Sequence, residues 1–174
     1  MKPFIGIKKI WYGDVITEAV TKTTLKTWLR TATEVKNSHQ DTWQYTEDDP
    51  TYTDYINELT GKIYYRDVTQ NGAKTITFTM GEFTFDDKVD LQGGEKVDTD
   101  AGWAASDTPG IVNKAIVGQT KTGNYVVFTN AAVIAKGTMA EKNIGLGVTA
   151  IAMENENEGV KSDYLFDGAK VDAV

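Results

Sequence analysis

The side chains that could do chemistry are few, and one class is missing altogether. The chain of 174 residues has no cysteine and one histidine, His39. The missing cysteine excludes disulfides, thiol nucleophiles, thiolate zinc sites and iron–sulfur clusters. A His-based triad or a two-His metal site would need a second chain. His39 could pair with Asp41 or a remote serine, but short motifs often match by chance. We interpret His39 as a polar residue of a strand or turn.

A second candidate is the group of carboxylates on either side of Pro50. Its members are Glu47, Asp48, Asp49, Asp54 and Glu58. Such a group could chelate calcium or supply an acid–base pair. Calcium loops alternate oxygen ligands with a glycine at a fixed offset, and this spacing does not match. A glycosidase pair is recognised only by its geometry. We therefore expect a solvated acidic loop.

The dipeptide Gly93-Gly94 could be taken for a loop that cradles phosphate. No GxGxxG or GxxxxGK[ST] pattern surrounds it, and glycine commonly follows the last turn of a helix. We expect a helix to end here.

Aromatic residues crowd the first 65 positions. They are Trp11, Trp28, Trp43, Tyr45, Tyr52, Tyr55, Tyr64 and Tyr65. Exposed rings could stack on sugars, but tryptophan and tyrosine are also enriched in cores and subunit interfaces. We favour core and interface. We assign no catalytic, cofactor-binding or metal-binding residue, and we expect a protein that is not an enzyme.

Composition limits the class of protein further. The formal net charge is −7, from 18 basic and 25 acidic residues, which argues against specific nucleic-acid binding because that needs clustered Lys and Arg. Hydrophobic residues make up 40% and charged residues 25%, which are values of a globular chain. No signal peptide or apolar run of about 20 residues is present, so we expect no membrane segment. The expectation is a single domain, intracellular or exported without a classical signal.

The first third of the chain has mixed patterns. Residues 3–12 predict an edge strand or a docking arm. Residues 15–35 combine helical spacing, at Leu25, Trp28, Leu29 and Ala32, with six threonines from Thr21 to Thr33 that favour strands. Residues 34–47 have a period near two and predict a half-exposed strand.

The next segment begins with the acidic turn. Pro50 and its acidic neighbours predict this turn. Residues 52–59 have helical spacing, with Asp49 as N-cap and Gly61 past the end, and a polar extended arm is the alternative. Residues 63–68 and 74–83 predict two strands, and the turn dipeptide Asn71-Gly72 would join them as a hairpin.

The strand predicted at 74–83 has the cleanest alternation in the chain. Ile76, Phe78 and Met80 share one face, and Thr75, Thr77 and Thr79 share the other. This alternation predicts one buried face and one face in water.

The remainder predicts one helix and three more strands. Residues 86–92 form the helix, and 95–110 form a loop anchored by Trp103. Strands are predicted at 114–119, 125–134 and 143–153. In the last strand, Gly145 and Gly147 indicate a bulge or a close backbone approach.

These elements predict a mainly β fold, a β-sandwich or partly closed barrel of about seven strands with one short flanking helix. The whole chain, 1–174, is one domain, with residues 1–12 as an N-terminal arm and residues 155–174 as a loose C-terminal tail that could also dock on a neighbour.

The order and character of the elements resemble those of bacteriophage major tail proteins, also called tail tube proteins. The resemblance covers roughly residues 34–155 and includes no invariant motif. Its second-half features are the strand at 74–81, the helix at 86–92 with its Gly93-Gly94 stop, the strand at 124–131 and the closing strand at 141–150. Its first-half features are the strand into Trp43-Gln44-Tyr45, the acidic turn at 47–50 and the connection from 52 to 65.

The resemblance implies a structural protein of the virion tail, made and assembled in the cytoplasm of the bacterial host. In that family, six copies form a ring whose inner sheets join edge to edge, and rings stack into a hollow tube that conducts DNA. The implied partners are further copies of the chain and other tail proteins, such as the tape measure, baseplate or terminator. DNA would be passing cargo only. The acidic loop at 47–58 and the two termini are the candidates for contacts between rings.

The charge of the chain is compatible with that role. A ring of six copies would carry 6 × −7 = −42, and acidic residues lining a lumen would repel DNA phosphate. The threonine face of residues 74–83 would face the lumen or the outside.

Two other classes remain as alternatives. One is the tube protein of a contractile injection or secretion apparatus, which shares this fold family. The other is a β-sandwich carbohydrate-binding module, which would need exposed coplanar aromatic rings.

Overall fold

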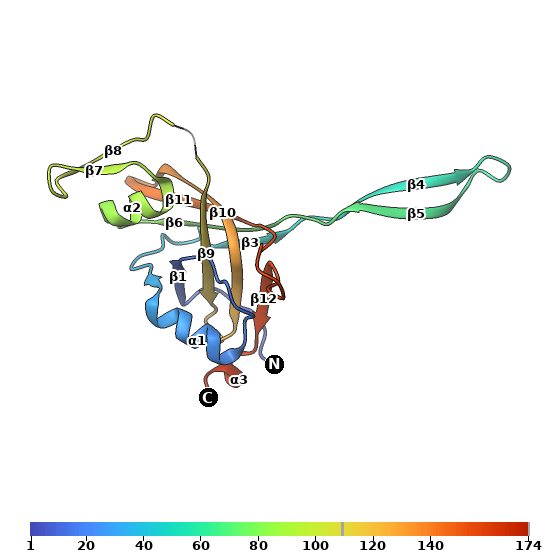
Figure 1. The fold of residues 1–174 in the computed structure, drawn as a ribbon, viewed down its shortest axis with the longest axis horizontal. Helices are drawn as coiled ribbons and strands as arrows, with labels where there is room; N and C mark the ends of the chain where they lie inside the picture. Colours follow the sequence, from blue (N-terminus) through green and yellow to red (C-terminus); the bar gives the residue numbers. More distant parts are fainter. Residues whose placement is uncertain (109, 174) are drawn as a thin grey trace.

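The computed structural model describes residues 1–108 and 110–173, which form a β-rich body with one long projecting hairpin (Figure 1). The predicted mainly β fold is confirmed, with twelve strands in antiparallel sheets and three helices among these residues. The strands are β1 (Lys9–Gly13), β2 (Thr33–Glu34), β3 (Gln44–Glu47), β4 (Thr51–Asn57), β5 (Lys62–Gln70), β6 (Lys74–Met80), β7 (Glu95–Val97), β8 (Gly102–Ala104), β9 (Val112–Gln119), β10 (Tyr125–Ala140), β11 (Asn143–Ala152) and β12 (Asp163–Phe166). The helices are α1 (Lys22–Thr31), α2 (Phe85–Gln92) and α3 (Gly168–Val171).

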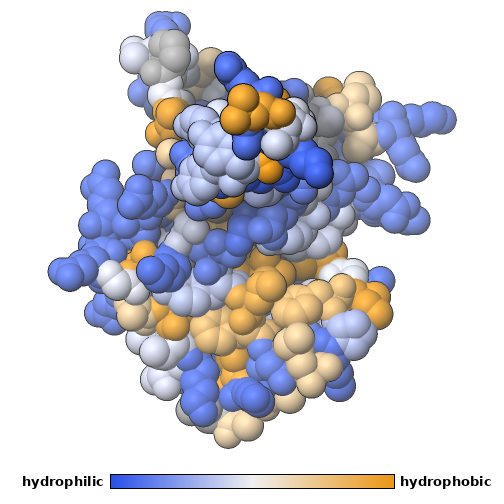
Figure 2. Space-filling view, turned by 90° about the vertical axis from the view of Figure 1, so that its right-hand side faces the viewer, coloured by the Kyte–Doolittle hydropathy of each residue, from blue (hydrophilic) through white to orange (hydrophobic). Residues whose placement is uncertain are grey.

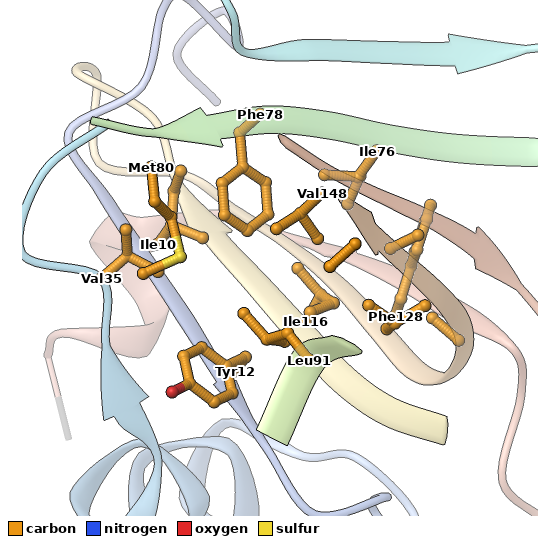
Figure 3. Packing of buried hydrophobic residues seen from close by; sticks show 14 of the residues in the cluster. Ile10, Tyr12, Val35, Ile76, Phe78, Met80, Leu91, Ile116, Phe128 and Val148 are labelled. Carbon is orange, nitrogen blue, oxygen red and sulfur yellow. The ribbon is translucent and has the colours of Figure 1, made fainter. Parts of the chain in front are cut away.

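One large sheet forms the body. Its strand order is β2-β1-β9-β10-β11-β6-β3, and β12 pairs with the first residues of β10. Strands near both ends of this order contribute to the same core: Tyr12 of β1 and Phe78 of β6 both belong to the cluster that contains Phe128 of β10. The sheet therefore curls so that its two halves face each other, which agrees with the expected sandwich. Figure 3 shows these side chains converging, with Leu91 of α2 beside them.

A second apolar cluster covers the other face of β1, β9 and β10. Trp11, Val117 and Val127 alternate along their strands with residues of the first core, as the two-residue period of a strand requires. Leu25 of α1 and Val171 of α3 complete this cluster. Both faces of these strands are buried, which explains why they lack simple alternation in the sequence.

The mixed signal at 15–35 resolves into the helix α1. Its apolar residues lie three and four positions apart, as the sequence pattern indicates. Thr21 is the N-cap and forms a reciprocal capping box with Thr24, so two of the threonines stabilise the start of the helix. Thr21 and Thr24 therefore mark the start of the helix, and Thr33 begins β2.

The helix predicted at residues 86–92 is confirmed as α2. Thr84 and Asp87 form its capping box, and Gly93 follows with φ 84°. The Tyr12 hydroxyl donates a hydrogen bond of 2.6 Å to Asp87, which ties the helix to β1. The loop predicted at 95–110 contains the small hairpin β7–β8, and its Trp103 indole donates to the carbonyl of Gly93. Residue 109 of that prediction lies outside the described residues.

Three predictions for the first half are wrong. Residues 34–47 are strand only in β2 and β3, because the chain between them crosses from one end of the sheet to the other. Residues 52–59 do not form the predicted helix but the extended arm given as its alternative, because they lie in β4 and the start of its turn. The hairpin predicted around Asn71-Gly72 does not form, because β5 pairs with β4 and β6 pairs with β3 and β11.

The two terminal segments lie against the chain's own body. Residues 9–12 belong to β1, between β2 and β9, and Lys121 donates its backbone N–H to the carbonyl of Ile5. In the tail, Asn155 is buried and donates to the Ile16 carbonyl and the Thr129 hydroxyl, while β12 pairs with β10. Within the single chain, both terminal segments are thus held by contacts with the body.

The inner face of β10–β11 gives a test of the core. Leu146 is fully buried, and Ile144, two residues earlier on the same face, is 65% exposed. Leu146→Ala should lower the free energy of unfolding by about 2–5 kcal/mol because it leaves a cavity. Ile144→Ala should change it by no more than about 0.5 kcal/mol. Urea denaturation of both variants checks this, and equal effects would contradict the assigned end of the core.

The docking of the tail gives a test at high pH. Burial and the nearby Asp172 raise the pKa of Tyr125 from 10.0 to about 12. The unfolded chain loses this proton at lower pH than the folded chain, so the free energy of unfolding should fall between pH 10 and 12. In Tyr125→Phe that fall should be shallower. Denaturation curves across this pH range measure it, and an unchanged slope would contradict the assignment.

Candidate functional site: the projecting β4–β5 arm

The most unusual feature of the molecule is the hairpin of β4 and β5, which projects away from the body (Figure 1). We call residues 51–70 the arm. The chain enters the arm from β3 and returns from it into β6, so the arm continues a strand pair of the large sheet. Seven strand residues span roughly 23 Å. The arm therefore reaches well beyond the body.

The base of the arm is a close contact between two backbone segments. An added Cβ on Gly72 would overlap the carbonyl oxygen of Asp48, so only glycine fits there. Beside it, the Asp48 N–H donates to the Ala73 carbonyl at 2.9 Å. The Asn71-Gly72 dipeptide, expected to form a turn, instead allows the two chains to meet where the arm leaves the sheet.

Polar contacts fix the middle of the arm. Arg66 donates through two nitrogens to both carboxylate oxygens of Asp54, at 2.5 and 2.8 Å. The guanidinium also lies 4.0 Å from the ring centre of Tyr52. This pairing lowers the pKa of Asp54 and raises the pKa of Arg66. The arrangement gives the two strands a defined register, although all three groups are accessible to water.

Apolar side chains lie on both faces of the arm. Direct strand partners share a face, so Tyr55 and Tyr65 lie together, with ring centres 5.7 Å apart, and Ile56 lies beside Ile63 on the opposite face. Leu59 in the turn is 95% exposed. The arm's large apolar side chains that remain exposed are Tyr52, Tyr55, Ile56, Leu59, Ile63, Tyr64, Tyr65 and Val68.

The view along the arm shows how much apolar surface this side of the molecule carries. Figure 2 shows apolar atoms at the end of the arm and a larger apolar area on the body below it. Contiguous exposed apolar surface on a protein usually marks an interaction site.

The acidic residues singled out in the sequence do not converge on a reaction centre. Glu47 lies 3.6 Å from Lys74, Asp54 pairs with Arg66, and Glu58 lies in the turn of the arm. Within residues 1–108 and 110–173, no group of three or more His, Asp or Glu side chains could hold a metal ion. Asp48 and Asp49 lie at the arm base, where a cleft of about 1180 Å³ is bordered by Asp48 and by Glu154, Glu156 and Glu158.

The structure also places the other candidates. His39 is half-buried, with Nδ1 3.2 Å from the carbonyl of Gln40, and its backbone N–H donates to the carbonyl of Thr79. Asp41 accepts a hydrogen bond from the side-chain amide of Gln40. Gly93 ends α2 as expected. Gly94 then brings the backbone so close to β8 that an added Cβ would overlap the carbonyl oxygen of Ala104.

The crowded aromatic residues divide into two groups. Trp11, Trp28, Trp43 and Tyr45 pack on the two cores of the body, as expected for core residues. The other four, Tyr52, Tyr55, Tyr64 and Tyr65, belong to the arm. The sequence does not separate these groups, because nothing in the local pattern shows which strands have a layer of structure above them.

The threonine face of β6 is only partly open to water. Thr77 is half-buried and lines a shallow hollow with Thr149 and Lys136. Thr79 is 8% exposed because residues 38–42 cover it, and its N–H bonds to the Thr42 hydroxyl. The close approach expected at the glycines of β11 is present: a Cβ on Gly145 would lie 2.7 Å from the Met80 carbonyl oxygen.

Comparison with known proteins gives no family assignment. No protein-family model matches the chain, and no curated protein matches it. Among the described residues, no helix is long and apolar enough to cross a membrane. The functional proposal therefore depends on the arm and on the resemblance in the sequence.

The arm base can be tested by one added carbon. Gly72→Ala should force Asp48 away and open the base, which should lower the free energy of unfolding by about 1–3 kcal/mol. Amide hydrogen exchange at Asp48 should become faster as its bond to Ala73 is lost. Gly137→Ala is the matched control, because nothing lies within 4 Å of that added carbon. Equal effects of the two substitutions would contradict the close contact.

Proposed function

We propose that this chain is a structural protein that assembles with copies of itself, through the arm, into rings that stack into a phage tail tube. The observation that carries this proposal is the uncovered arm. A hairpin of two strands is marginally stable alone in water, and this one exposes apolar side chains on both faces. A binding partner that covers those faces would explain both its length and its composition.

The resemblance of the sequence to tail tube proteins supports a second copy as that partner. The acidic loop at 47–58, a candidate for contacts between rings, contains the whole of β4. Each strand of the arm also has an edge that is not paired within the described residues and can accept a further strand. In this proposal the protein acts in the virion tail, with other tail proteins at the ends of the tube and DNA as passing cargo.

The net charge of −7 supports a conduit that does not hold DNA tightly, because a DNA-binding surface needs clustered cations. That acidic residues line the lumen stays a prediction. The hollow on the threonine face of β6 is lined mainly by polar side chains, several of them hydroxyls, with Lys136 as a cation.

The tyrosines of the arm also bear on the alternative of a carbohydrate-binding module. Tyr55 and Tyr65 are accessible, but their ring planes are inclined at 44° to each other. A flat platform for a sugar would need the rings to be closer to coplanar. This geometry favours a protein partner. A tube protein of a contractile injection or secretion apparatus would use the arm in the same way.

Assembly can be tested directly. Purified protein at rising concentration should form rings or hollow tubes, visible by negative-stain electron microscopy and as large species in sedimentation. Leu59→Ser combined with Tyr64→Ser removes two of the most exposed apolar side chains and should raise the concentration needed for assembly at least about tenfold. Tyr64→Phe keeps the aromatic ring and should assemble normally. Both side chains belong to the arm and to neither core of the body, so circular dichroism should be unchanged.

A wild-type chain that stays monomeric at every concentration would contradict the proposal. A shift in melting temperature on adding oligosaccharides would favour the carbohydrate-binding alternative instead.

A further inference from the structure

The arm is not the only uncovered apolar surface, and a second one lies at the opposite end of the molecule. In Figure 1 the arm extends to the right of the body, and the turn between β10 and β11 lies on the left, beside α2 and β7–β8. The register of β6 also places the arm and the β10–β11 turn at opposite ends of the molecule. β6 begins at Lys74, next to the arm, and its other end, Met80, pairs with Leu146 near the β10–β11 turn.

The apolar face of β10–β11 continues past the end of the core. Val148 and Leu146 lie on this face and are buried, and the next residue on it, Ile144, is 65% exposed. Its direct partner across the strand pair is Met139, also 65% exposed. The pairing of β9 with β10 ends at Val112 and Val133, so β9 does not extend over this part. We call Met139 and Ile144 the acceptor pair.

We propose that the arm of one copy packs on the acceptor pair of the next copy, so that the chain assembles head to tail. This inference rests on the proposed function and names the surface on which the arm docks. Both surfaces are apolar, and they lie at opposite ends of β6, so an arm cannot reach the acceptor pair of its own chain. A reach of roughly 23 Å is long enough to lay the arm along a neighbouring β10–β11 hairpin.

Covering both surfaces has a clear energetic benefit. Removing a large apolar side chain from water is favourable, and the gain grows with the apolar area that is covered. The arm and the acceptor pair supply several such side chains, and tyrosine is favoured at interface centres because it brings large contact area with little loss of side-chain freedom. The contact is also directional, since a different surface is used on each copy. Interfaces of this kind form closed rings or open filaments.

Another apolar surface could receive the arm, and the two can be distinguished. β12 lies on the same side of the body as the arm (Figure 1), and its Leu165 is 57% exposed. Two copies facing each other could each lay an arm there, and that symmetric pair would close as a dimer. Such a dimer would leave the acceptor pair uncovered.

Engineered cysteines give the sharpest test, because the chain has none of its own. Two single variants, Tyr64→Cys and Ile144→Cys, are mixed under assembly conditions, oxidised and analysed by mass spectrometry. A disulfide between positions 64 and 144 of different copies is expected. Tyr64→Cys mixed with Ile134→Cys is the matched control, because Ile134 is 58% exposed but lies on the opposite face of the hairpin. With Leu165→Cys as a third variant, a disulfide between positions 64 and 165 in place of the expected one would overturn the inference.

Assembly measurements separate this inference from the proposed function. Met139→Ser with Ile144→Ser should raise the assembly concentration at least about tenfold, and Ile134→Ser should leave it unchanged. If the arm variants block assembly but the double serine variant does not, the arm docks elsewhere and only this inference fails. If the wild-type chain does not assemble, both fail.

Discussion

A two-stranded hairpin with no layer on either face cannot bury its own apolar side chains, and the arm is such a hairpin. In the body, apolar side chains of the same kinds are buried, because the sheet curls around Phe78 and Phe128 and helices cover its outer face. In the arm, Tyr64 and Leu59 remain in water. The ion pair of Asp54 with Arg66 fixes only the register of β4 and β5. The free energy that such side chains can contribute becomes available only when a partner covers them.

The arm is held rigidly enough to be presented to that partner because it grows out of a strand pair inside the sheet. β6 lies between β3 and β11, and Lys74 at its start donates a 2.8 Å hydrogen bond to Asp163 of β12. That contact raises the pKa of Lys74. Gly72 then allows the departing chains to approach within backbone contact distance. The direction of the arm is thus set by the body, which reduces the entropy lost on docking.

The fold class, α2 and most of β9, β10 and β11 could be predicted from the sequence, because each has a clear local pattern, whereas the short strands β7, β8 and β12 were expected as loop or tail. For residues 52–59 the sequence left a helix and a polar extended arm open, because these residues are exposed on both faces and no core selects a period of two. The spacing of Tyr52, Tyr55, Ile56 and Leu59 fits a helix equally well, and strand pairing over a distance decided against it. The Asn71-Gly72 dipeptide wrongly predicted a turn, because glycine is needed at position 72 for a close backbone contact with Asp48. Of the acceptor pair, only Ile144 falls in a predicted strand, because Met139 lies beyond the strand predicted at 125–134. The exposure of both side chains depends on where neighbouring strands stop, which local sequence does not show.

Head-to-tail docking would also explain how a strongly acidic chain can assemble at all. Copies that each carry a charge of −7 repel one another, and the repulsion grows with every copy added. The arm carries three carboxylates and two cations, of which Asp54 and Arg66 pair with each other, and the turn beside the acceptor pair carries one charge of each sign, on Glu141 and Lys142. The proposed contact therefore joins two segments of low net charge. The carboxylates of Glu156 and Glu158 lie in the loop beside the arm base, away from the acceptor end. An assembly joined in this way leaves one arm and one acceptor pair free at its ends, so it can either close or continue to grow by adding copies at those ends.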